Sequence, residues 1–375
     1  MSGSHDRLVA GCMTGTSIDG IDAALVRVSG TGLAMRASFV RGVSRSLGEL
    51  AAPLRGLAEQ EPMTAGDIAR LSRDFALLHV EVVRELVGAD PLSMISAHGQ
   101  TVFHAPPASW QLLDPTPIAL GLRVPVVTHL RGADLAAGGQ GAPITPLSDW
   151  IMLRSPGESR AVVNLGGFCN VTLLPSDATV ANGDAATGPL ESARRVSGCD
   201  VCACNHVLDT VARRCLAVPF DESGQRALAG TVHDDALDDL RSVLMVQASS
   251  KRSLGTGDEV TGWIGRYRTT CDGADLAATA CEAIAEMIAA KVAGVDRVLL
   301  AGGGVMNRAL IRAIASCCSA PVQTTTEHGL DGRYREAAAM AVLGALCQDG
   351  VPITLSAVTR CPGLPPRAGV WAYPI

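Results

Sequence analysis

The sequence contains few aromatic residues, no long apolar run and no concentration of basic residues. Phe, Trp and Tyr make up 3% of the 375 residues, so the core must be built mainly from Ala, Val and Leu. No uninterrupted apolar run reaches the roughly 18 residues that indicate a membrane-spanning helix. The net charge is −6, and Lys and Arg are scattered along the chain. This distribution argues against a nucleic-acid partner, which requires a concentrated basic surface.

Signals for export and the two commonest nucleotide-binding loops are also missing. The opening residues "MSGSHDRLVAGC" carry charge before any apolar segment, so we expect a cytoplasmic protein without a signal peptide. The 12 cysteines are then expected to be reduced thiols that serve mainly as small buried residues. Neither the Walker phosphate loop nor the dinucleotide fingerprint occurs in the chain.

The composition that remains is typical of a well-buried globular protein. Hydrophobic residues make up 47% of the chain and charged residues 18%. A chain of 375 residues exceeds the size at which one core continues to grow. Two domains are therefore the default expectation.

Three segments place glycines at the ends of predicted strands. Residues 7–13 and 21–28 form strands around the turn "GTSIDG", and "RAVVNLGGFCNVTLL" at 160–174 repeats this pattern. At 295–314 a buried strand ends in three glycines and a helix follows. Such turns let backbone N–H groups approach an anion, with plain hairpin or packing turns as the alternative. Together the segments predict a duplicated α/β architecture with a cleft between its halves.

Other segments predict long helices and a connection between domains. Helices are expected at 64–88, where Thr64 can cap the start and Gly88 can end it, at 275–294 and at 332–350. The Gly- and Pro-punctuated segment 122–146 is expected to cross between domains.

A cysteine-rich segment, "GCDVCACNHVLD" at 198–209, raises the question of a metal site. Four nominal ligands are available in it: Cys199, Cys202, Cys204 and His206. Their C-x-x-C-x-C-x-H spacing is too cramped to surround one tetrahedral ion easily, and no second CxxC occurs. We therefore predict no metal here and interpret the cysteines as packing residues.

Eight motifs occur in one order over most of the chain. They are "GCMTGTSIDGIDAALV" (11–26), "HGQTVFHAPP" (98–107), "QLLDPTPIA" (111–119), "LRGADLAAGGQGAPITPLSD" (130–149), "NLGGFCNVT" (164–172), "KRSLGTGDE" (251–259), "AGGGVMN" (301–307) and "REAAAMAVLG" (335–344). Together they resemble the anhydro-N-acetylmuramic acid kinases, a family in the sugar kinase, heat-shock protein 70 and actin superfamily.

The resemblance implies a two-domain, actin-like α/β fold with an active-site cleft between the domains. We expect residues 1–131 and 351–375 in domain I and residues 132–350 in domain II. The implied reaction uses ATP and Mg²⁺ to open the anhydro bridge of 1,6-anhydro-N-acetylmuramic acid with water and to phosphorylate O6. The product is N-acetylmuramic acid 6-phosphate, in cell-wall recycling.

The resemblance also assigns the segment with the cysteines. Family members have G-F-D-T-G-P-G-N-x-L-L-D, in which the Asp is the catalytic base, and this register places Asp200 at that position. Asp184, in "NGDAATGPLES", is the alternative, but it lacks the following Asn and helix start. Residues 176–197 then form an inserted surface loop. The Val-Cys-Ala-Cys at 201–204 replaces T-G-P-G, which puts the substrate range in doubt.

The remaining site residues are carried over from the matching motifs. Nucleotide-binding residues are expected at Gly15, Thr16, Ser17, Ile18, Asp19, Gly20, Ile21, Asp22, Asn164, Gly166, Gly167, Gly302, Gly303, Gly304, Asn307 and Glu336. Sugar-binding residues are expected at His98, Gln100, Thr101, Arg131, Asp134 and Asn205. An arginine suits the lactyl carboxylate because its planar fork binds bidentately. Turn capping, surface ion pairing and helix capping are the structural alternatives for the charged members of this set.

Two other functions stay open beside the leading one. The altered segment at 201–204 is compatible with a kinase of a different anhydro- or amino-sugar. The chain is also compatible with a nucleotide-binding homologue that has lost its chemistry. The expected partners are a small-molecule sugar and ATP, without nucleic acid or membrane. A homodimer stays open, because the sequence does not decide the oligomeric state.

Overall fold

The computed structural model describes residues 6–15, 17–176, 188–249 and 258–374. The chain divides into two compact units. Unit 1 comprises Met1–Arg154, Thr179–Ser197 and Gly329–Ile375, and unit 2 comprises Ser155–Ala178 and Gly198–His328. The candidate base Asp184, Thr16 and most of the 251–259 motif lie outside the described residues. Segment 176–197, expected to be a loop, contains the helix α6 (Gly188–Arg194). The expectation that no helix starts soon after Asp184 was therefore wrong.

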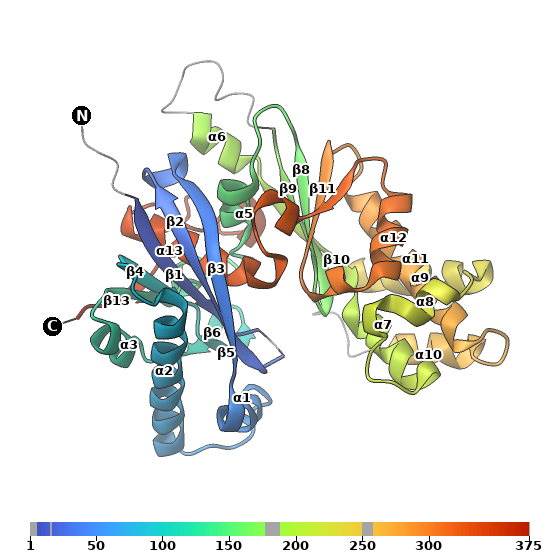
Figure 1. The fold of residues 1–375 in the computed structure, drawn as a ribbon, viewed down its shortest axis with the longest axis horizontal. Coiled ribbons are helices and arrows are strands. Elements are labelled where there is room, and N and C mark those ends of the chain that lie inside the picture. Colours follow the sequence, from blue (N-terminus) through green and yellow to red (C-terminus); the bar gives the residue numbers. More distant parts are fainter. Residues whose placement is uncertain (1–5, 16, 177–187, 250–257, 375) are drawn as a thin grey trace. The chain divides into compact units, whose positions relative to one another are not determined.

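Unit 1 is built on a six-stranded mixed sheet in the order β13-β7-β4-β1-β2-β3 (Figure 1). Its strands are β1 (Arg7–Met13), β2 (Gly20–Ser29), β3 (Arg36–Ser46), β4 (Met94–Ala97), β7 (Val126–Thr128) and β13 (Val370–Ala372). Strands β1, β2 and β3 pair antiparallel in chain order, whereas β4 pairs parallel with both β1 and β7. A separate two-stranded hairpin consists of β5 (Gln100–Ala105) and β6 (Ala108–Leu112).

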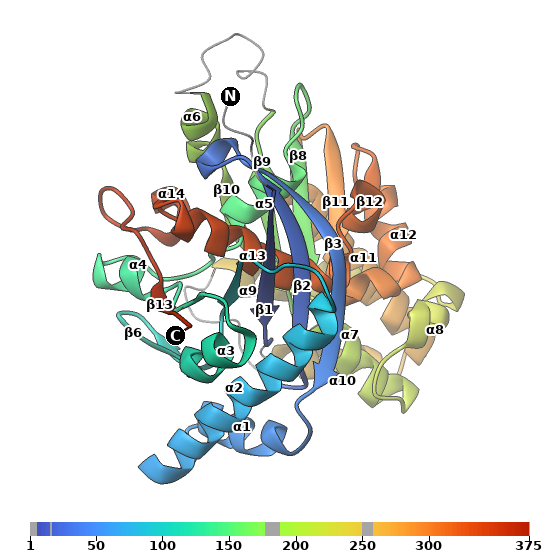
Figure 2. The same ribbon diagram turned by 60° about the vertical axis from the view of Figure 1, so that its left-hand side comes forward.

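Helices cover both faces of this sheet (Figure 2). The helices of unit 1 are α1 (Ala51–Ala58), α2 (Ala65–Val87), α3 (Pro115–Leu122), α4 (Gly132–Ala136), α5 (Pro146–Leu153), α6 (Gly188–Arg194), α13 (Arg335–Gln348) and α14 (Ser356–Thr359). Ala10 and Cys12 of β1 lie in one core with residues of α2, whereas Gly11 between them meets α13. Because successive strand residues point to opposite faces, α2 and α13 cover opposite sides of the sheet.

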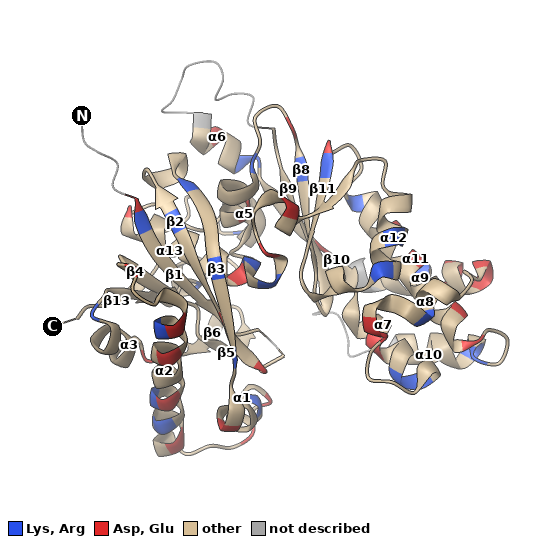
Figure 3. Cartoon of the chain, in the orientation of Figure 1, with Lys and Arg blue, Asp and Glu red and all other residues tan. Residues whose placement is uncertain are grey.

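The long helix α2 follows from its sequence. The Thr64 side chain accepts a hydrogen bond from the Asp67 N–H, and Gly88 ends the helix with a φ of 59°. Leu71, Phe75 and Val82 are among the residues that it buries in the core of unit 1. Figure 3 shows Lys and Arg interspersed with Asp and Glu along the same helix. Exposed pairs of this kind add little stability, so the apolar side holds the helix in place.

Unit 2 has a five-stranded sheet in the order β10-β9-β8-β11-β12. Its strands are β8 (Arg160–Leu165), β9 (Phe168–Leu174), β10 (Ser197–Ala203), β11 (Arg297–Ala301) and β12 (Val322–Thr324). Its helices are α7 (Asn205–Val211), α8 (Gln225–Ala229), α9 (Asp234–Ser249), α10 (Asp258–Tyr267), α11 (Gly273–Lys291) and α12 (Arg308–Cys317). Strand β11 pairs parallel with β8 and β12, and α11 supplies many residues of the core.

The two units differ from the predicted domain boundaries. Residues 132–154 and 329–350 were expected in domain II, whereas they cluster with unit 1. The reason lies in α13, which packs against β1, β2 and β4 across a long sequence separation. Segment 122–146, which was expected to cross between domains, also lies within unit 1. The assignment of residues 1–131 and 351–375 to one functional domain and of residues 132–350 to the other stays a prediction.

Gly11 illustrates how closely α13 approaches β1. A Cβ at this position would lie 1.9 Å from the Ala337 carbonyl oxygen and 2.4 Å from the Ala341 nitrogen. Because backbone atoms cannot move aside, Gly11→Ala is expected to lower the free energy of unfolding by about 3 kcal/mol. The measurement is urea unfolding, with Gly265→Ala in α10 as the control, since nothing lies within 4 Å of a Cβ there. The control is expected to gain about 1 kcal/mol from helix propensity. Wild-type stability of Gly11→Ala would contradict the packing.

Candidate functional site

The first glycine-rich turn, between β1 and β2 in unit 1, has a strained backbone. Ile18 adopts a φ of 51° although it is β-branched, and its N–H donates to the Gly15 carbonyl at 3.2 Å. The Ser17 hydroxyl donates to the Asp19 carboxylate at 2.9 Å, and the Leu47 N–H donates to the Asp19 carbonyl. Strain held by such contacts is frequent at ligand-binding turns. Gly20 and Ile21 follow as the first residues of β2.

Asp22 lies one step beyond this turn, half-buried on β2 and opposite Ser44 of β3. The Ser44 hydroxyl donates to its carboxylate. Burial raises the pKa of Asp22, while Ser44 and the positive charge of Arg333 act in the opposite direction. Arg333 was not predicted from the sequence, although it stands three residues before Glu336, which was predicted to bind the nucleotide.

His98 and Arg131 form a direct contact. The Arg131 Nε donates to His98 Nε2 at 2.8 Å, and His98 Nδ1 donates to the Gly99 carbonyl at 2.9 Å. Burial, followed by the charge of Arg131, lowers the pKa of His98 to about 3, so the imidazole is neutral. Burial lowers the pKa of Arg131 to about 10, against the opposing effect of Glu336. These contacts assign the proton of His98 to Nδ1.

Asp134 is buried and bound within unit 1. One carboxylate oxygen accepts from the Gly141 N–H and the other from the Thr359 hydroxyl, each at 2.7 Å. A Cβ on Gly139 would lie 2.2 Å from the same carboxylate. The side chain therefore holds the 138–141 glycine turn. Its predicted role in sugar binding stays a prediction.

Glu336 lies in the first turn of α13, next to a buried ion pair. The Arg335 Nε donates to the Asp149 carboxylate at 2.9 Å, and its Nη2 donates to the other oxygen. The two side chains are only 3% and 2% exposed. This pair anchors the start of α13, and with it Glu336. Sequence analysis missed the pair, because its partners are 186 positions apart.

In unit 2 the β8–β9 turn is bound to the start of α7. The N–H of Cys204 donates to the Gly167 carbonyl at 2.9 Å, and the N–H of Asn205 donates to the Gly166 carbonyl at 3.0 Å. The Asn205 side chain donates to the Leu165 carbonyl at 3.2 Å. Gly167 has no room for a side chain, because a Cβ would lie 2.5 Å from His206 Nε2. Asn205, predicted to bind sugar, thus also links two backbone segments.

The three-glycine turn after β11 packs against Asn164 and Leu165 at the end of β8. Gly302 has a φ of 84°, and a Cβ there would lie 2.7 Å from the Asn164 Oδ1. A Cβ on Gly304 would lie 2.6 Å from Leu165 Cβ. Gly303 is exposed between them. Asn307 then caps α12 by accepting from the Leu310 N–H at 3.0 Å. The structure therefore brings most of the predicted nucleotide-binding residues of unit 2 together.

Asp200 lies in β10, whose first residues are mostly exposed and whose last three residues are buried. Asp200 and Cys199 are exposed, whereas Val201, Cys202 and Cys204 are buried. Desolvation by neighbouring atoms raises the pKa of Asp200 above its usual value. Burial raises the pKa of Cys202 to about 12 and that of Cys204 well above the usual range, so both stay neutral thiols. Within the described residues, no group of three or more His, Cys, Asp or Glu side chains is arranged to hold a metal ion.

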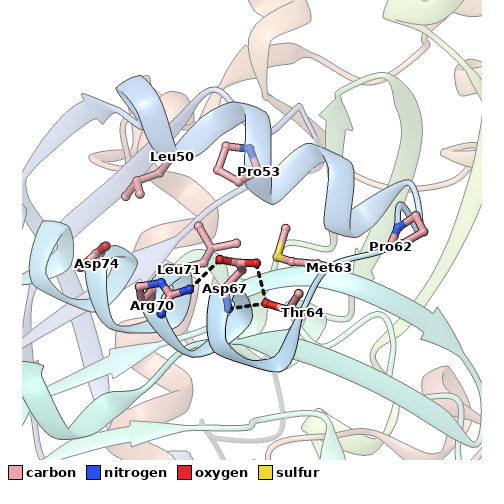
Figure 4. A pocket seen from close by; sticks show the side chains of 9 residues that line it. All are labelled: Leu50, Pro53, Pro62, Met63, Thr64, Asp67, Arg70, Leu71 and Asp74. Atoms are coloured by element: carbon pink, nitrogen blue, oxygen red, sulfur yellow. Dashed lines mark hydrogen bonds and ion pairs between the residues drawn. The ribbon is translucent and has the colours of Figure 1, made fainter.

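A cavity in unit 1 lies apart from all these residues. It has a volume of about 520 Å³ and lies between α1 and the start of α2 (Figure 4). Its lining residues are Leu50, Pro53, Pro62, Met63, Thr64, Asp67, Arg70, Leu71 and Asp74. None of the predicted site residues lines it, so it gives no support to the predicted site.

Comparison with known proteins adds the family. The family model for anhydro-N-acetylmuramic acid kinase matches residues 7–363. The chain belongs to this family. An anhydro-N-acetylmuramic acid kinase of Salinibacter ruber is 32% identical, with 94% of this chain and 93% of that protein covered. One of Xanthomonas campestris pv. campestris is 33% identical, with 99% and 98% covered.

Membership of the anhydro-N-acetylmuramic acid kinase family identifies the chain as a kinase that uses ATP. The two units, each with a mixed sheet and helices, confirm the predicted α/β class. A ROK family glucokinase from Streptomyces griseus, solved with glucose and AMPPNP, aligns over 90% of this chain and 98% of that chain. That alignment has 13% identity and a TM-score of 0.36. No helix in the described part of the chain is long and apolar enough to span a membrane.

Proposed function

We propose that this kinase converts 1,6-anhydro-N-acetylmuramic acid, water and ATP into N-acetylmuramic acid 6-phosphate and ADP. The observation that supports the proposal is the carboxylate of Asp200, the residue that the motif resemblance assigns as the base. It is exposed on β10, five residues before the start of α7. The cell-wall recycling pathway is the proposed setting.

Asp200 is the proposed general base. It accepts a proton from water while the water oxygen attacks the anomeric carbon, and the bond from that carbon to O6 breaks. The released O6 attacks the γ-phosphorus of ATP, and ADP leaves. The raised pKa of Asp200 makes its carboxylate a better proton acceptor than an ordinary Asp.

Backbone groups and one arginine are the proposed binding elements. Gly166, Gly167 and Gly302–Gly304 are proposed to bind phosphate oxygens through backbone N–H groups, and Gly303 is the exposed member of this set. The glycine-containing β1–β2 turn of unit 1 is likewise proposed to bind phosphate oxygens through backbone N–H groups. The Arg131 guanidinium is proposed to bind the lactyl carboxylate, because it stays charged despite its lowered pKa of about 10.

The carboxylates of Asp19, Asp22 and Glu336 suit the implied Mg²⁺ chemically. They offer the oxygen ligands that Mg²⁺ prefers. The Ser17 hydroxyl donates to one oxygen of Asp19, and the Ser44 hydroxyl donates to one oxygen of Asp22. Each carboxylate therefore keeps further lone pairs for a metal ion. When bound, the ion supplies positive charge to the phosphate oxygens.

The test mixes purified protein with ATP, Mg²⁺ and 1,6-anhydro-N-acetylmuramic acid and follows ADP and sugar phosphate. Equal amounts of both products are expected. A different anhydro- or amino-sugar is the second candidate, because residues 201–204 differ from the T-G-P-G of the family motif. Their two cysteines are buried, Cys202 within β10 and Cys204 directly after it. Folded, ATP-binding protein that phosphorylates only another sugar of a panel would favour this candidate. Nucleotide binding without turnover of any sugar in the panel would contradict both.

A further inference from the structure

The β5–β6 hairpin of unit 1 has one polar face. In its register Thr101 pairs with Gln111 and His104 pairs with Ser109, with a bulge between Thr101 and Phe103. Hydrogen bonds between their side chains place these four on the same face. Phe103 precedes His104 directly, so its side chain points to the other face.

The four polar side chains form a continuous chain of hydrogen bonds. The Gln111 amide donates to the Ser109 Oγ at 2.8 Å and approaches the Thr101 Oγ1 at 3.5 Å. The Ser109 hydroxyl donates to the Phe103 carbonyl at 3.2 Å. Since its only proton is used there, Ser109 accepts from His104 Nδ1 at 2.9 Å. The opposite ring nitrogen of His104, Nε2, is therefore a hydrogen-bond acceptor.

The surroundings of His104 link it to the residues predicted to bind sugar. Thr101 lies at the other end of the hydrogen-bond chain. The charge of Arg131 acts on both His98 and His104, and His104 also acts on His98. His104 itself is exposed, whereas His98 and Gln100 are buried. An oriented, exposed acceptor therefore stands on the strand that also carries Gln100 and Thr101.

The structure assigns His104 as a further sugar-binding residue, with Nε2 accepting a hydrogen bond from a hydroxyl or amide N–H of the sugar. Ser109 and Gln111 are positioning residues, because they hold the imidazole through Nδ1. This inference rests on the proposed function, since it names another contact for the same substrate.

Two substitutions distinguish a sugar contact from a structural role. His104→Asn places an amide near the position of Nδ1, which keeps the bond to Ser109 but leaves nothing at the position of Nε2. His104→Gln places its amide near the position of Nε2. We expect His104→Asn to raise the KM for the sugar about tenfold, with the KM for ATP unchanged. His104→Gln is expected to stay within about threefold of wild type, because it retains the sugar contact.

The control is Phe103→Leu, on the opposite face of the same hairpin, which is expected to leave both KM values unchanged. Thermal unfolding of each variant checks that the hairpin is folded. A wild-type sugar KM in His104→Asn would overturn the inference while leaving the proposed function standing. Equal rises in both His104 variants would also overturn it, because they would indicate a structural role. Absence of turnover in the wild type would instead remove the proposed function and the inference with it.

Discussion

Asp200→Asn is expected to lower kcat about 1000-fold, with little change in the KM for ATP. The amide has the same shape as the carboxylate but cannot accept the proton of the attacking water. The exposed position of Asp200 on β10 means that the substitution leaves no buried group without a partner. The measurement is steady-state formation of ADP and sugar phosphate, with thermal unfolding to verify the fold.

Asp184→Asn is the matched control, because it makes the same chemical change at the other candidate base. Turnover close to wild type is expected for this variant. If Asp184→Asn abolishes turnover and Asp200→Asn does not, the register that aligns Asp200 with the family's base is wrong. Equal losses in both variants would contradict a single general base.

Arg335→Met is expected to lower the free energy of unfolding by about 3–5 kcal/mol. The substitution keeps most of the side-chain volume but removes the bidentate cation from the buried Asp149 carboxylate. That carboxylate is 2% exposed, so water cannot replace the lost charge. Urea unfolding measures the change.

The double variant Arg335→Met with Asp149→Leu tests this cause. Most of the lost stability is expected to return, because two buried charges are replaced by apolar groups of similar size. Arg45→Met, which removes exposed ion pairs to Glu81 and Glu85, is the control and should cost less than about 1 kcal/mol. A double variant no more stable than Arg335→Met would mean that packing, not charge, holds the start of α13.

The parts of the fold predicted correctly are those that local sequence determines. Helix α2 begins after Thr64 and ends at Gly88, as the capping pattern indicates. The strand–turn–strand segments also occur where glycines interrupt apolar runs, as β1–β2 and β8–β9. In each case the signal lies within a few residues of the feature that it predicts.

Features that depend on distant partners were not predictable. The pairing of Arg335 with Asp149 and the hydrogen bond from Thr359 to Asp134 join segments that are 186 and 225 positions apart. The clustering of residues 329–350 with unit 1 has the same origin. Local patterns contain no information on such contacts. The hydrogen-bond chain from Thr101 to His104 was missed for a different reason, because a bulge decides which side chains share a face.

The chain order of the two units has a consequence for synthesis. The residues of unit 2 lie between segments of unit 1, and α13 belongs to the last segment, Gly329–Ile375. A ribosome therefore releases nearly all of unit 2 before it makes the helix that covers β1, β2 and β4. Until then one face of the first sheet, including Gly11, has no cover from α13. The nascent chain therefore passes through a stage in which the sheet face later covered by α13 is exposed to solvent. Exposed apolar surface at such a stage favours aggregation and is bound by chaperones.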